Sequence, residues 1–204
     1  IIEKPDEATR AALPKPVFED VSARLRHTHV EEPFDDFSRQ LLLPNMLAQL
    51  GPGVAWSDLN GDGFDDLIIG SGKGGALAVL QNDTKGGFTR LAQPPFNLTA
   101  ERDLTTVLSL PTATGASLIL AGSANYEDGQ AAGSLVRVYD PRTNTVLDRF
   151  PGQASSTGPM SLADVDGDGD LDLFVGGRVV PGRYPEPASS FLFLNDGGSF
   201  KVDA

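Results

Sequence analysis

The 204-residue chain contains no cysteine, which excludes disulfide bonds, cysteine-ligated zinc and thiol catalysis. It lacks a Gly-x-Ser-x-Gly elbow, and it has only two histidines, His27 and His29. No apolar run approaches about 18 residues, so the sequence predicts no transmembrane helix. Lys and Arg number 16 against 28 Asp and Glu, and the net charge of −12 argues against binding the phosphate backbone of nucleic acids.

Aspartate is concentrated in two stretches, Asp58–Asp66 (DLNGDGFDD) and Asp164–Asp172 (DVDGDGDLD). Each reads Asp-x-(Asp/Asn)-Gly-Asp-Gly-x-x-Asp and runs directly into a short apolar stretch, LIIG or LFVG. Oxygen ligands at alternate positions suit Ca²⁺, which takes six to eight oxygens at about 2.3–2.6 Å. The glycine at position 6 lets the backbone reverse, because glycine adopts positive φ freely. We therefore expect two calcium sites.

The expected ligands follow from the positions in each loop. In the first loop they are the side chains of Asp58, Asn60, Asp62 and Asp66 and the carbonyl of Phe64. In the second loop they are the side chains of Asp164, Asp166, Asp168 and Asp172 and the carbonyl of Asp170. Two carboxylates about 4 Å apart repel by about 4 kcal/mol at an effective dielectric of 20, so the second loop, with four carboxylates, should depend more strongly on calcium.

Two alternatives compete with this interpretation. An EF-hand requires Glu at position 12 between flanking helices, whereas Ile69 and Val175 occupy that position within apolar runs. A solvated Asp/Gly turn would explain one loop, but two matched five-position patterns disfavour it. Two bound calcium ions would change the net charge from −12 to −8.

The loops belong to a repeat. Aligning Asp58 with Asp164 places Leu110 between them at spacings of 52 and 54 residues, and Gly70, Gly122 and Gly176 keep the same register. The middle copy, Leu110–Leu118 (LPTATGASL), has no carboxylate, so we expect its turn to close without an ion. Such a period is typical of solenoids, propellers and arrays.

Each repeat predicts four short strands, which is the pattern of a β-propeller blade in an all-β fold. The predicted strands are Val54–Ser57, Leu67–Gly70, Leu77–Gln81, Phe88–Leu91, Thr106–Ser109, Leu118–Ala121, Leu135–Tyr139, Val146–Phe150, Met160–Ala163, Leu171–Val175, Phe191–Leu194 and Phe200–Val202. The repeats span about 51–104, 105–158 and 159–204. Three blades are fewer than the four to eight of a closed propeller. We therefore expect part of a longer chain, or a ring completed by other segments, and the first residue, Ile1, is not Met.

The acidic loops and the Gly-ended strands after them resemble the FG-GAP (VCBS-type) repeat of integrin α-subunit propellers, over about Gly51 to Val202. The segments FEDV, HVEEPFDDFSRQLLLP and LGPGVAWSDLNGDGFDDLIIG also resemble secreted proteins of the cartilage-acidic-protein (ASPIC/UnbV) group. The resemblance implies a calcium-braced propeller used for adhesion or scaffolding, usually outside the cytosol. The middle repeat departs from the pattern, so no metal is implied there.

The segment before the repeats is expected to contain a linker or extended arm (1–17) and an outer strand with an insertion that packs on the propeller (18–50). Phe18–Val21 (FEDV) resembles the strand that ends each repeat. Phe34, Phe37 and Leu41 have helical spacing, but prolines limit a helix there to about two turns, and we expect these side chains to pack on the sheets. Trp56 is expected in the core, and Pro181–Pro187 in a loop on a face suited to partners.

Catalytic motifs are weak. GSGKGG (Gly70–Gly75) fits a dinucleotide fingerprint only if a helix follows, and the next residues predict a strand. His27 and His29, with Glu31 and Glu32, are able to bind a transition metal or exchange protons, but a polar loop is the favoured interpretation. We expect a non-enzymatic, extracytoplasmic module for a protein or glycan partner. The alternatives are a carbohydrate-active lyase or hydrolase and a structural subunit of a secreted assembly.

Overall fold

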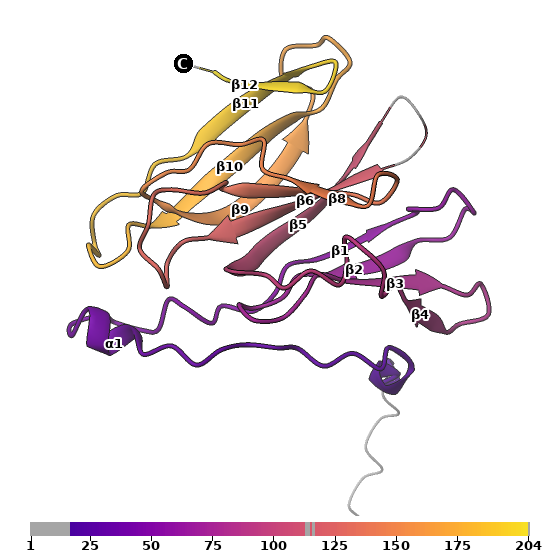
Figure 1. Cartoon of the computed structure of the whole chain (residues 1–204), viewed down its shortest axis with the longest axis horizontal. Coiled ribbons are helices and arrows are strands. Elements are labelled where there is room, and N and C mark those ends of the chain that lie inside the picture. The colour runs from indigo at the N-terminus through magenta and orange to yellow at the C-terminus, as the bar shows by residue number, and fades with distance from the viewer. Residues whose placement is uncertain (1–16, 113–114, 116, 204) are drawn as a thin grey trace, which may run out of the picture.

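The chain forms three four-stranded antiparallel sheets from three successive stretches of sequence, as the repeat predicts. The computed structural model describes residues 17–112, 115 and 117–203. In Figure 1 the sheets stand side by side, and the colour passes from one sheet to the next along the chain. None of the three closes on itself, so the described residues form a row of open, blade-like sheets and not a closed ring. No helix in this part of the chain is long and apolar enough to cross a membrane.

All twelve predicted strands have a counterpart. The first sheet consists of β1 (Val54–Ser57), β2 (Asp66–Ile69), β3 (Ala78–Asn82) and β4 (Phe88–Arg90). The middle sheet consists of β5 (Asp103–Pro111), β6 (Ser117–Ala124), β7 (Val136–Asp140) and β8 (Thr145–Leu147). The third sheet consists of β9 (Ser156–Ala163), β10 (Asp172–Val179), β11 (Phe191–Asp196) and β12 (Ser199–Val202). Strands β5, β6, β9 and β10 run further than predicted.

Apolar side chains between neighbouring sheets hold the row together. Successive side chains of a strand face opposite sides, so a sheet covered on both faces needs apolar residues at consecutive positions. The middle sheet meets this requirement: Ile119 faces the first sheet and Leu120 the third, and both are fully buried. Ile68 and Val79 complete the first core, and Leu173 and Phe193 the second.

Close approach of the first two sheets explains one of the repeated glycines. The Gly70 N–H donates to the carbonyl of Gly53 at 2.8 Å. A Cβ at Gly70 would collide with the carbonyl oxygen of Leu104, and a Cβ at Gly53 with the backbone of Thr105. Glycine at these positions therefore lets the backbone of the first sheet lie directly against the start of β5.

Strand register separates the two repeats with acidic loops from the middle one. Ser57 pairs with Asp66 in the first sheet, and the equivalent Ala163 pairs with Asp172 in the third. In the middle sheet, Leu118 pairs with Leu110 and not with Ser109, which is the equivalent of Ser57. A one-residue slip turns the side chains of a strand to the opposite face. Leu108 and Leu110 therefore pack toward the third sheet.

The two ends of the row expose apolar residues. Trp56 is 56% exposed, whereas its equivalent Leu162 packs against the middle sheet. The expectation that Trp56 lies in the core is therefore wrong, because no sheet covers this side of β1 in the described part of the chain. At the other end Phe174 is 45% exposed, although its equivalents Ile68 and Leu120 are fully buried.

The segment before β1 runs along one end of the sheets (Figure 1). It contains η1 (Ser22–Arg24) and α1 (Asp36–Arg39). Leu25 packs on β2 and β3 of the first sheet, and Phe34 packs against Tyr126 and Val179, so the expected packing of this segment is present at those two side chains. Residues 1–16 of the predicted arm lie outside the described residues, and the boundaries assigned to the repeats remain a prediction.

Two expectations for this segment are wrong. Phe18–Val21 forms no strand: no strand lies beside it among the described residues, and the Asp20 carboxylate accepts the N–H of Ser22 at 2.9 Å to begin a turn. The helix α1 has one turn only, and Phe37 and Leu41 are exposed. The Asp35 carboxylate caps the N–H of Phe37, and Gln40 is already extended. Pro181–Pro187 does form a loop, between β10 and β11.

A matched pair of substitutions tests the packing of the row. Leu120→Ala removes a fully buried side chain between two sheets and should lower the free energy of unfolding by about 2–5 kcal/mol. Phe174→Ala, at the equivalent but exposed position, should cost less than about 1 kcal/mol in this chain. Urea denaturation followed by circular dichroism measures both values, and equal losses would contradict the exposed end face.

Candidate metal centre

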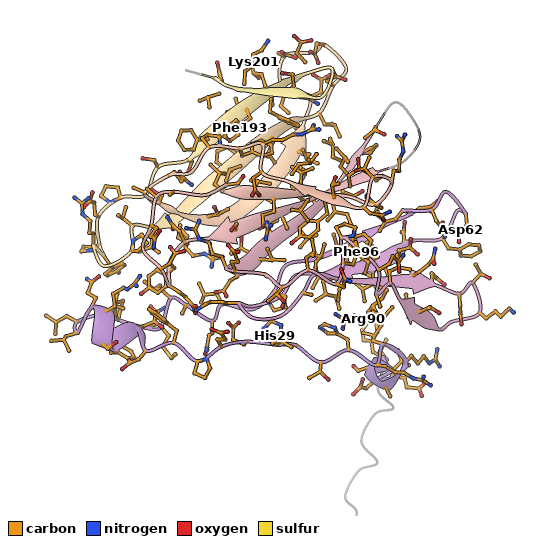
Figure 2. The ribbon with its side chains drawn as sticks, viewed as in Figure 1. His29, Asp62, Arg90, Phe96, Phe193 and Lys201 are labelled. Atoms are coloured by element: carbon orange, nitrogen blue, oxygen red, sulfur yellow. The ribbon has the colours of Figure 1, made fainter. Side chains whose placement is uncertain are left out.

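The two acidic loops connect equivalent strands at the same end of their sheets. Asp58–Asp66 joins β1 to β2, and Asp164–Asp172 joins β9 to β10. Figure 1 shows both connections at the ends of the sheets remote from the N-terminal segment, and Figure 2 shows Asp62 at the tip of the first loop. The structure therefore places the ten predicted ligand residues in two separate hairpin turns.

The first loop folds around the carboxylate of Asp58. Its Oδ1 accepts the N–H of Gly61 at 2.7 Å, and its Oδ2 accepts the N–H of Gly63 at 2.8 Å. Hydrogen bonds, first of all the one from Gly63, lower the pKa of Asp58. Gly61 and Gly63 both have positive φ, 79° and 85°, which explains the glycines at positions 4 and 6.

The second loop repeats this arrangement. Asp164 accepts the N–H groups of Gly167 at 2.7 Å and Gly169 at 3.1 Å. The two glycines have φ values of 82° and 95°. The common sequence pattern therefore specifies a common turn, in which the first aspartate orients the backbone and both of its oxygens are directed into the loop.

The ninth residue of each loop is a buried anchor. Asp66 and Asp172 are each 1% exposed. Asp66 accepts the N–H groups of Leu59 at 3.2 Å and Asn82 at 2.9 Å, so it links the loop to β3. Asp172 bonds in the same way to Val165 and Asn195. Burial raises the pKa of Asp66, although the hydrogen bonds from Asn82 and Leu59 act in the opposite direction.

The second loop brings its carboxylates together more closely. One oxygen from each of Asp164, Asp166 and Asp172 lies within 4.8 Å of the other two. The N–H of Asp168 lowers the pKa of Asp166, but burial and the surrounding carboxylates outweigh it, so that the net shift is upward. In the first loop position 3 is the neutral Asn60, whose side chain donates a hydrogen bond to Asp62 Oδ2 at 2.9 Å and so stabilises that carboxylate.

The remaining predicted ligands hold the tips of the loops. Asp62 Oδ1 accepts the N–H of Phe64 at 2.9 Å, and Asp168 Oδ1 accepts the N–H of Asp170 at 2.8 Å. The Asp170 side chain accepts the N–H of Gly197 at 2.8 Å and so ties the loop to the β11–β12 turn. The donor set of each loop consists of oxygens only, and this set fits a hard cation such as Ca²⁺.

The middle loop has a different basis. Leu110 and Leu118 pair across β5 and β6 and join the core with the third sheet. Ala113, Thr114 and Ala116 of this turn lie outside the described residues. Hydrophobic contact and strand pairing thus take the place of the aspartates at the first and ninth positions of the loop.

The predicted histidine cluster does not assemble around a common group. His27 is half-buried, and its ring nitrogens have no hydrogen-bond partner among the described residues. Burial lowers the pKa of His27, and the positive charge of Arg90 lowers it further. His29 Nε2 lies 3.3 Å from Glu31 Oε2. Glu32 pairs with Lys73 at 3.0 Å instead. After GSGKGG the chain forms β3 and not a helix, so the dinucleotide fingerprint lacks its structural context.

A group of acids that the sequence did not predict lies at the other end of the sheets. One oxygen from each of Glu31, Asp103 and Glu127 lies within 4.8 Å of the other two. Burial and the neighbouring charge of Asp103 raise the pKa of Glu31, and the same causes raise the pKa of Glu127 to about 7. The three residues are far apart in sequence and share no local pattern, so only the fold reveals the group.

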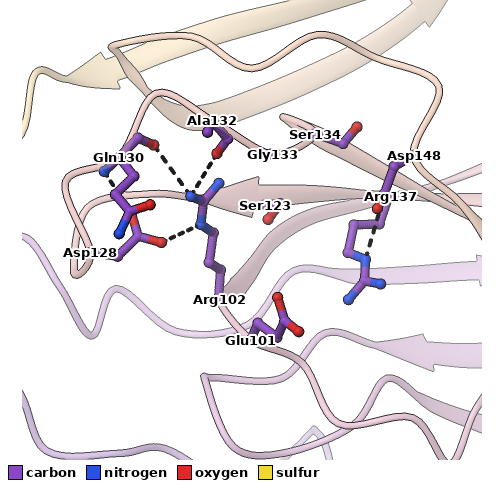
Figure 3. Close-up of a pocket in the computed structure, with 10 residues that line it drawn as sticks. All are labelled: Glu101, Arg102, Ser123, Asp128, Gln130, Ala132, Gly133, Ser134, Arg137 and Asp148. Atoms are coloured by element: carbon purple, nitrogen blue, oxygen red, sulfur yellow. Dashed lines mark hydrogen bonds and ion pairs between the residues drawn. The ribbon is translucent and has the colours of Figure 1, made fainter.

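A polar cavity of about 310 Å³ lies where β5 begins and β6 ends. Figure 3 shows two ion pairs within it. Arg102 Nε contacts Asp128 Oδ2 at 2.6 Å, and Arg137 Nε contacts Asp148 Oδ1 at 3.6 Å. Arg102 also donates to the carbonyl of Ala132, so its guanidinium fastens the β6–β7 loop.

Comparison with protein families matches residues 50–87 to the FG-GAP repeat. This span contains β1, the first acidic loop, β2 and β3. The comparisons with curated proteins and with solved structures give no match. The chain thus carries an FG-GAP repeat in its first sheet, and its three four-stranded sheets are consistent with a protein built from such repeats.

A reciprocal exchange at position 3 tests the electrostatics of the loops. Asn60→Asp adds a carboxylate to the first loop, and Asp166→Asn removes one from the second. In EDTA, Asn60→Asp should lower the melting temperature and Asp166→Asn should raise it, each by about 2–4 °C per kcal/mol of repulsion changed. Millimolar CaCl₂ should stabilise Asn60→Asp more than the wild type and Asp166→Asn less.

Thermal melts followed by circular dichroism, in EDTA and in CaCl₂, measure these shifts. Glu186→Gln, on the exposed Pro181–Pro187 loop, serves as a control that should respond like the wild type. An identical calcium response of the two loop variants would contradict a role for position 3.

Proposed function

We propose that the FG-GAP repeat at residues 50–87 is one of three blades of a calcium-braced β-propeller that acts outside the cytosol as a module for protein or glycan interaction, adhesion or scaffolding. One observation carries the proposal. The same nine-residue turn, with the same glycine conformations and the same buried anchor, recurs at the same end of the first and third sheets.

The acidic residues hold the loops ready for a cation. Asp58 and Asp164 fix the turns through backbone N–H groups, while Asp66 and Asp172 fasten them to the third strand of each sheet. Each ionised carboxylate offers about four lone-pair sites, so these hydrogen bonds leave acceptor capacity for a metal. When bound, calcium supplies the positive charge that offsets the repulsion among the carboxylates.

The end faces support a larger ring. Trp56 is exposed on one face of the first sheet. The corresponding face of the third sheet packs on the middle sheet. Phe174 is exposed on the opposite face of the third sheet. The corresponding face of the first sheet packs on the middle sheet. Further blades packed on these two faces would bury both residues.

The interaction role rests on the FG-GAP resemblance, since such repeats generally mediate protein interactions. The Pro181–Pro187 loop is a candidate contact surface. Its Tyr184 N–H donates to the side-chain oxygen of Gln40 at 3.0 Å, so the loop is held by the segment that precedes the sheets. A structural subunit of a larger secreted assembly would use the same surfaces.

A carbohydrate-active lyase or hydrolase is the second candidate, favoured by the polar cavity beside Arg102 and Arg137. Uronic acid polysaccharides are the appropriate probe, because a cavity with two arginines suits sugar carboxylates. We expect no new reducing ends or unsaturated products on incubation with them. Turnover that is abolished by Arg137→Gln would establish the enzyme instead.

Calcium dependence is the direct test of the main proposal. Calcium at a hundredfold excess over its dissociation constant should stabilise the chain by about 2.7 kcal/mol for each site occupied only in the native state. Urea unfolding in EDTA and in CaCl₂ measures the difference. The double variant Asp58→Asn/Asp164→Asn should lose the part of the response that comes from the loops. A double variant with an undiminished response would contradict calcium binding there.

A further inference from the structure

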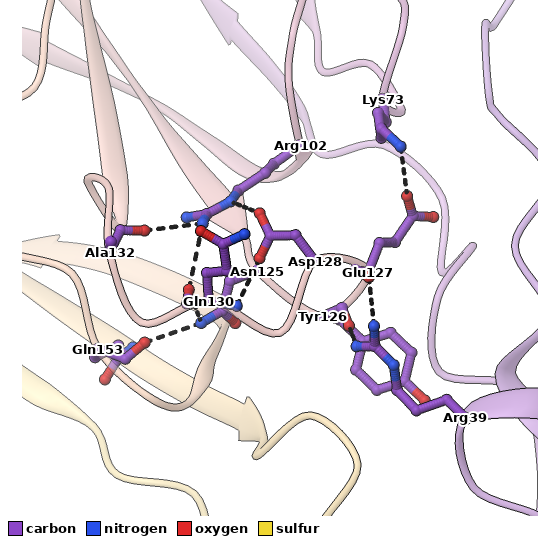
Figure 4. Close-up of polar contacts among 10 residues, drawn as sticks. All are labelled: Arg39, Lys73, Arg102, Asn125, Tyr126, Glu127, Asp128, Gln130, Ala132 and Gln153. Carbon is purple, nitrogen blue, oxygen red and sulfur yellow. Dashed lines mark hydrogen bonds and ion pairs between the residues drawn. The ribbon is translucent and has the colours of Figure 1, made fainter.

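Three separate elements meet at the acidic group remote from the loops. Glu31 lies in the segment before β1, Asp103 is the first residue of β5, and Glu127 follows β6. Figure 4 shows Glu127 directed toward Lys73, while Arg39 holds the backbone on either side of it through the carbonyls of Tyr126 and Glu127. These bonds fix the backbone from which the Glu127 side chain extends.

Two carboxylates of this half-buried group, those of Glu31 and Glu127, each have one buried oxygen without a hydrogen-bond donor among the described residues. The side chain of Glu127 is 10% exposed, and its Oε1 has no hydrogen-bond partner among the described residues. The Glu31 side chain is 18% exposed, and its Oε1 likewise has no hydrogen-bond partner among the described residues. A buried carboxylate oxygen without a donor is costly. The two oxygens therefore indicate that a positively charged ligand completes the group.

The charged neighbours leave negative charge in excess. Lys73 Nζ lies 3.0 Å from Glu32 but 3.8 Å from Glu127, beyond hydrogen-bond distance. Its backbone N–H, and not its ammonium group, bonds Asp103, at 2.8 Å. Arg178 lines the cavity beside Asp103, the Arg39 guanidinium is bonded to the backbone carbonyls of Tyr126 and Glu127, and His29 Nε2 lies 3.3 Å from Glu31 Oε2. Four carboxylates, with that of Glu32 included, thus share three permanent positive charges, those of Lys73, Arg178 and Arg39, of which Arg39 is bonded to backbone carbonyls and not to a carboxylate.

The available space admits an ion and excludes an organic molecule. A cavity of about 10 Å³ lies beside the group, and Glu31, Asp103, Ser71, Gly72 and Arg178 line it, whereas Glu127 does not. This volume is about the minimum that holds one water molecule. Gly72 lies so close to the Glu31 carboxylate that a Cβ there would collide with it. The space beside Glu31 and Asp103 therefore admits no more than a single small ion or water molecule, and Glu127 adds its carboxylate within 4.8 Å of theirs.

We propose that Glu31, Asp103 and Glu127 form a further divalent cation site, separate from the two loops. An all-carboxylate donor set favours a hard cation such as Ca²⁺ over a transition metal. Binding there fastens the segment before β1 to the start of β5 and the end of β6. The site is thus a clamp between the N-terminal segment and the middle sheet, at the end of the sheets opposite the loops.

The number of bound calcium ions tests this site. Equilibrium dialysis against CaCl₂ at pH 7.5 should give one ion fewer for Glu127→Gln than for the wild type. Glu186→Gln is the control, since Glu186 pairs with Arg183 on the exposed Pro181–Pro187 loop and not with the group, and it should keep the wild-type number. The result is independent of the loops, because the difference of one remains whether the loops bind two ions or none.

A second measurement guards against a folding defect in the variant. Calcium should slow hydrogen exchange of the backbone amide of Gly72, which donates to the carbonyl of Val30 at 3.1 Å next to Glu31. This protection should be lost in Glu127→Gln and in Asp103→Asn, while both keep the wild-type circular dichroism spectrum. Equal calcium numbers for Glu127→Gln and the wild type would overturn the proposal and indicate a proton shared among the acids instead.

Discussion

Face-to-face packing of apolar sheets is the interaction on which the rest of the molecule depends. The middle sheet is buried on both faces, with Ile119 directed to one neighbour and Leu120 to the other. This packing fixes the ends of the hairpins in space and allows a nine-residue loop to carry several aspartates without helical support. Carboxylates that would repel one another in a free peptide are held because the strands on either side cannot separate.

Features encoded within a few residues could be predicted from the sequence. The twelve strands follow from short apolar runs between turn residues, and the acidic turns follow from glycines that need positive φ. Features that depend on neighbours could not. Phe18–Val21 has the composition of an outer strand but has no strand beside it, and Trp56 has the composition of a core residue but lies on an uncovered face.

The acidic groups at the two ends of the sheets also differ in whether a local sequence pattern predicts them. Asp164, Asp166 and Asp172 lie within one turn, so a sequence pattern reveals them. Glu31, Asp103 and Glu127 come from three elements that only the packed sheets bring together. The repeat thus encodes the loops locally, whereas the group at the opposite end depends on the fold, because the segment before β1 supplies one of its three acids.

The slipped pairing of β5 and β6 bears on how the middle repeat could change. Placing the nine-residue acidic sequence at Leu110–Leu118 would not by itself recreate the turn. The pairing register of β5 and β6 differs by one residue from that of the strands that flank the acidic loops. Shifting β5 by one residue to the register of the other two sheets would turn Leu108 and Leu110 away from the third sheet. An acidic turn in the middle repeat would therefore require the interface between the middle and third sheets to repack. The apolar contacts of this interface thus oppose the introduction of aspartates at the middle turn.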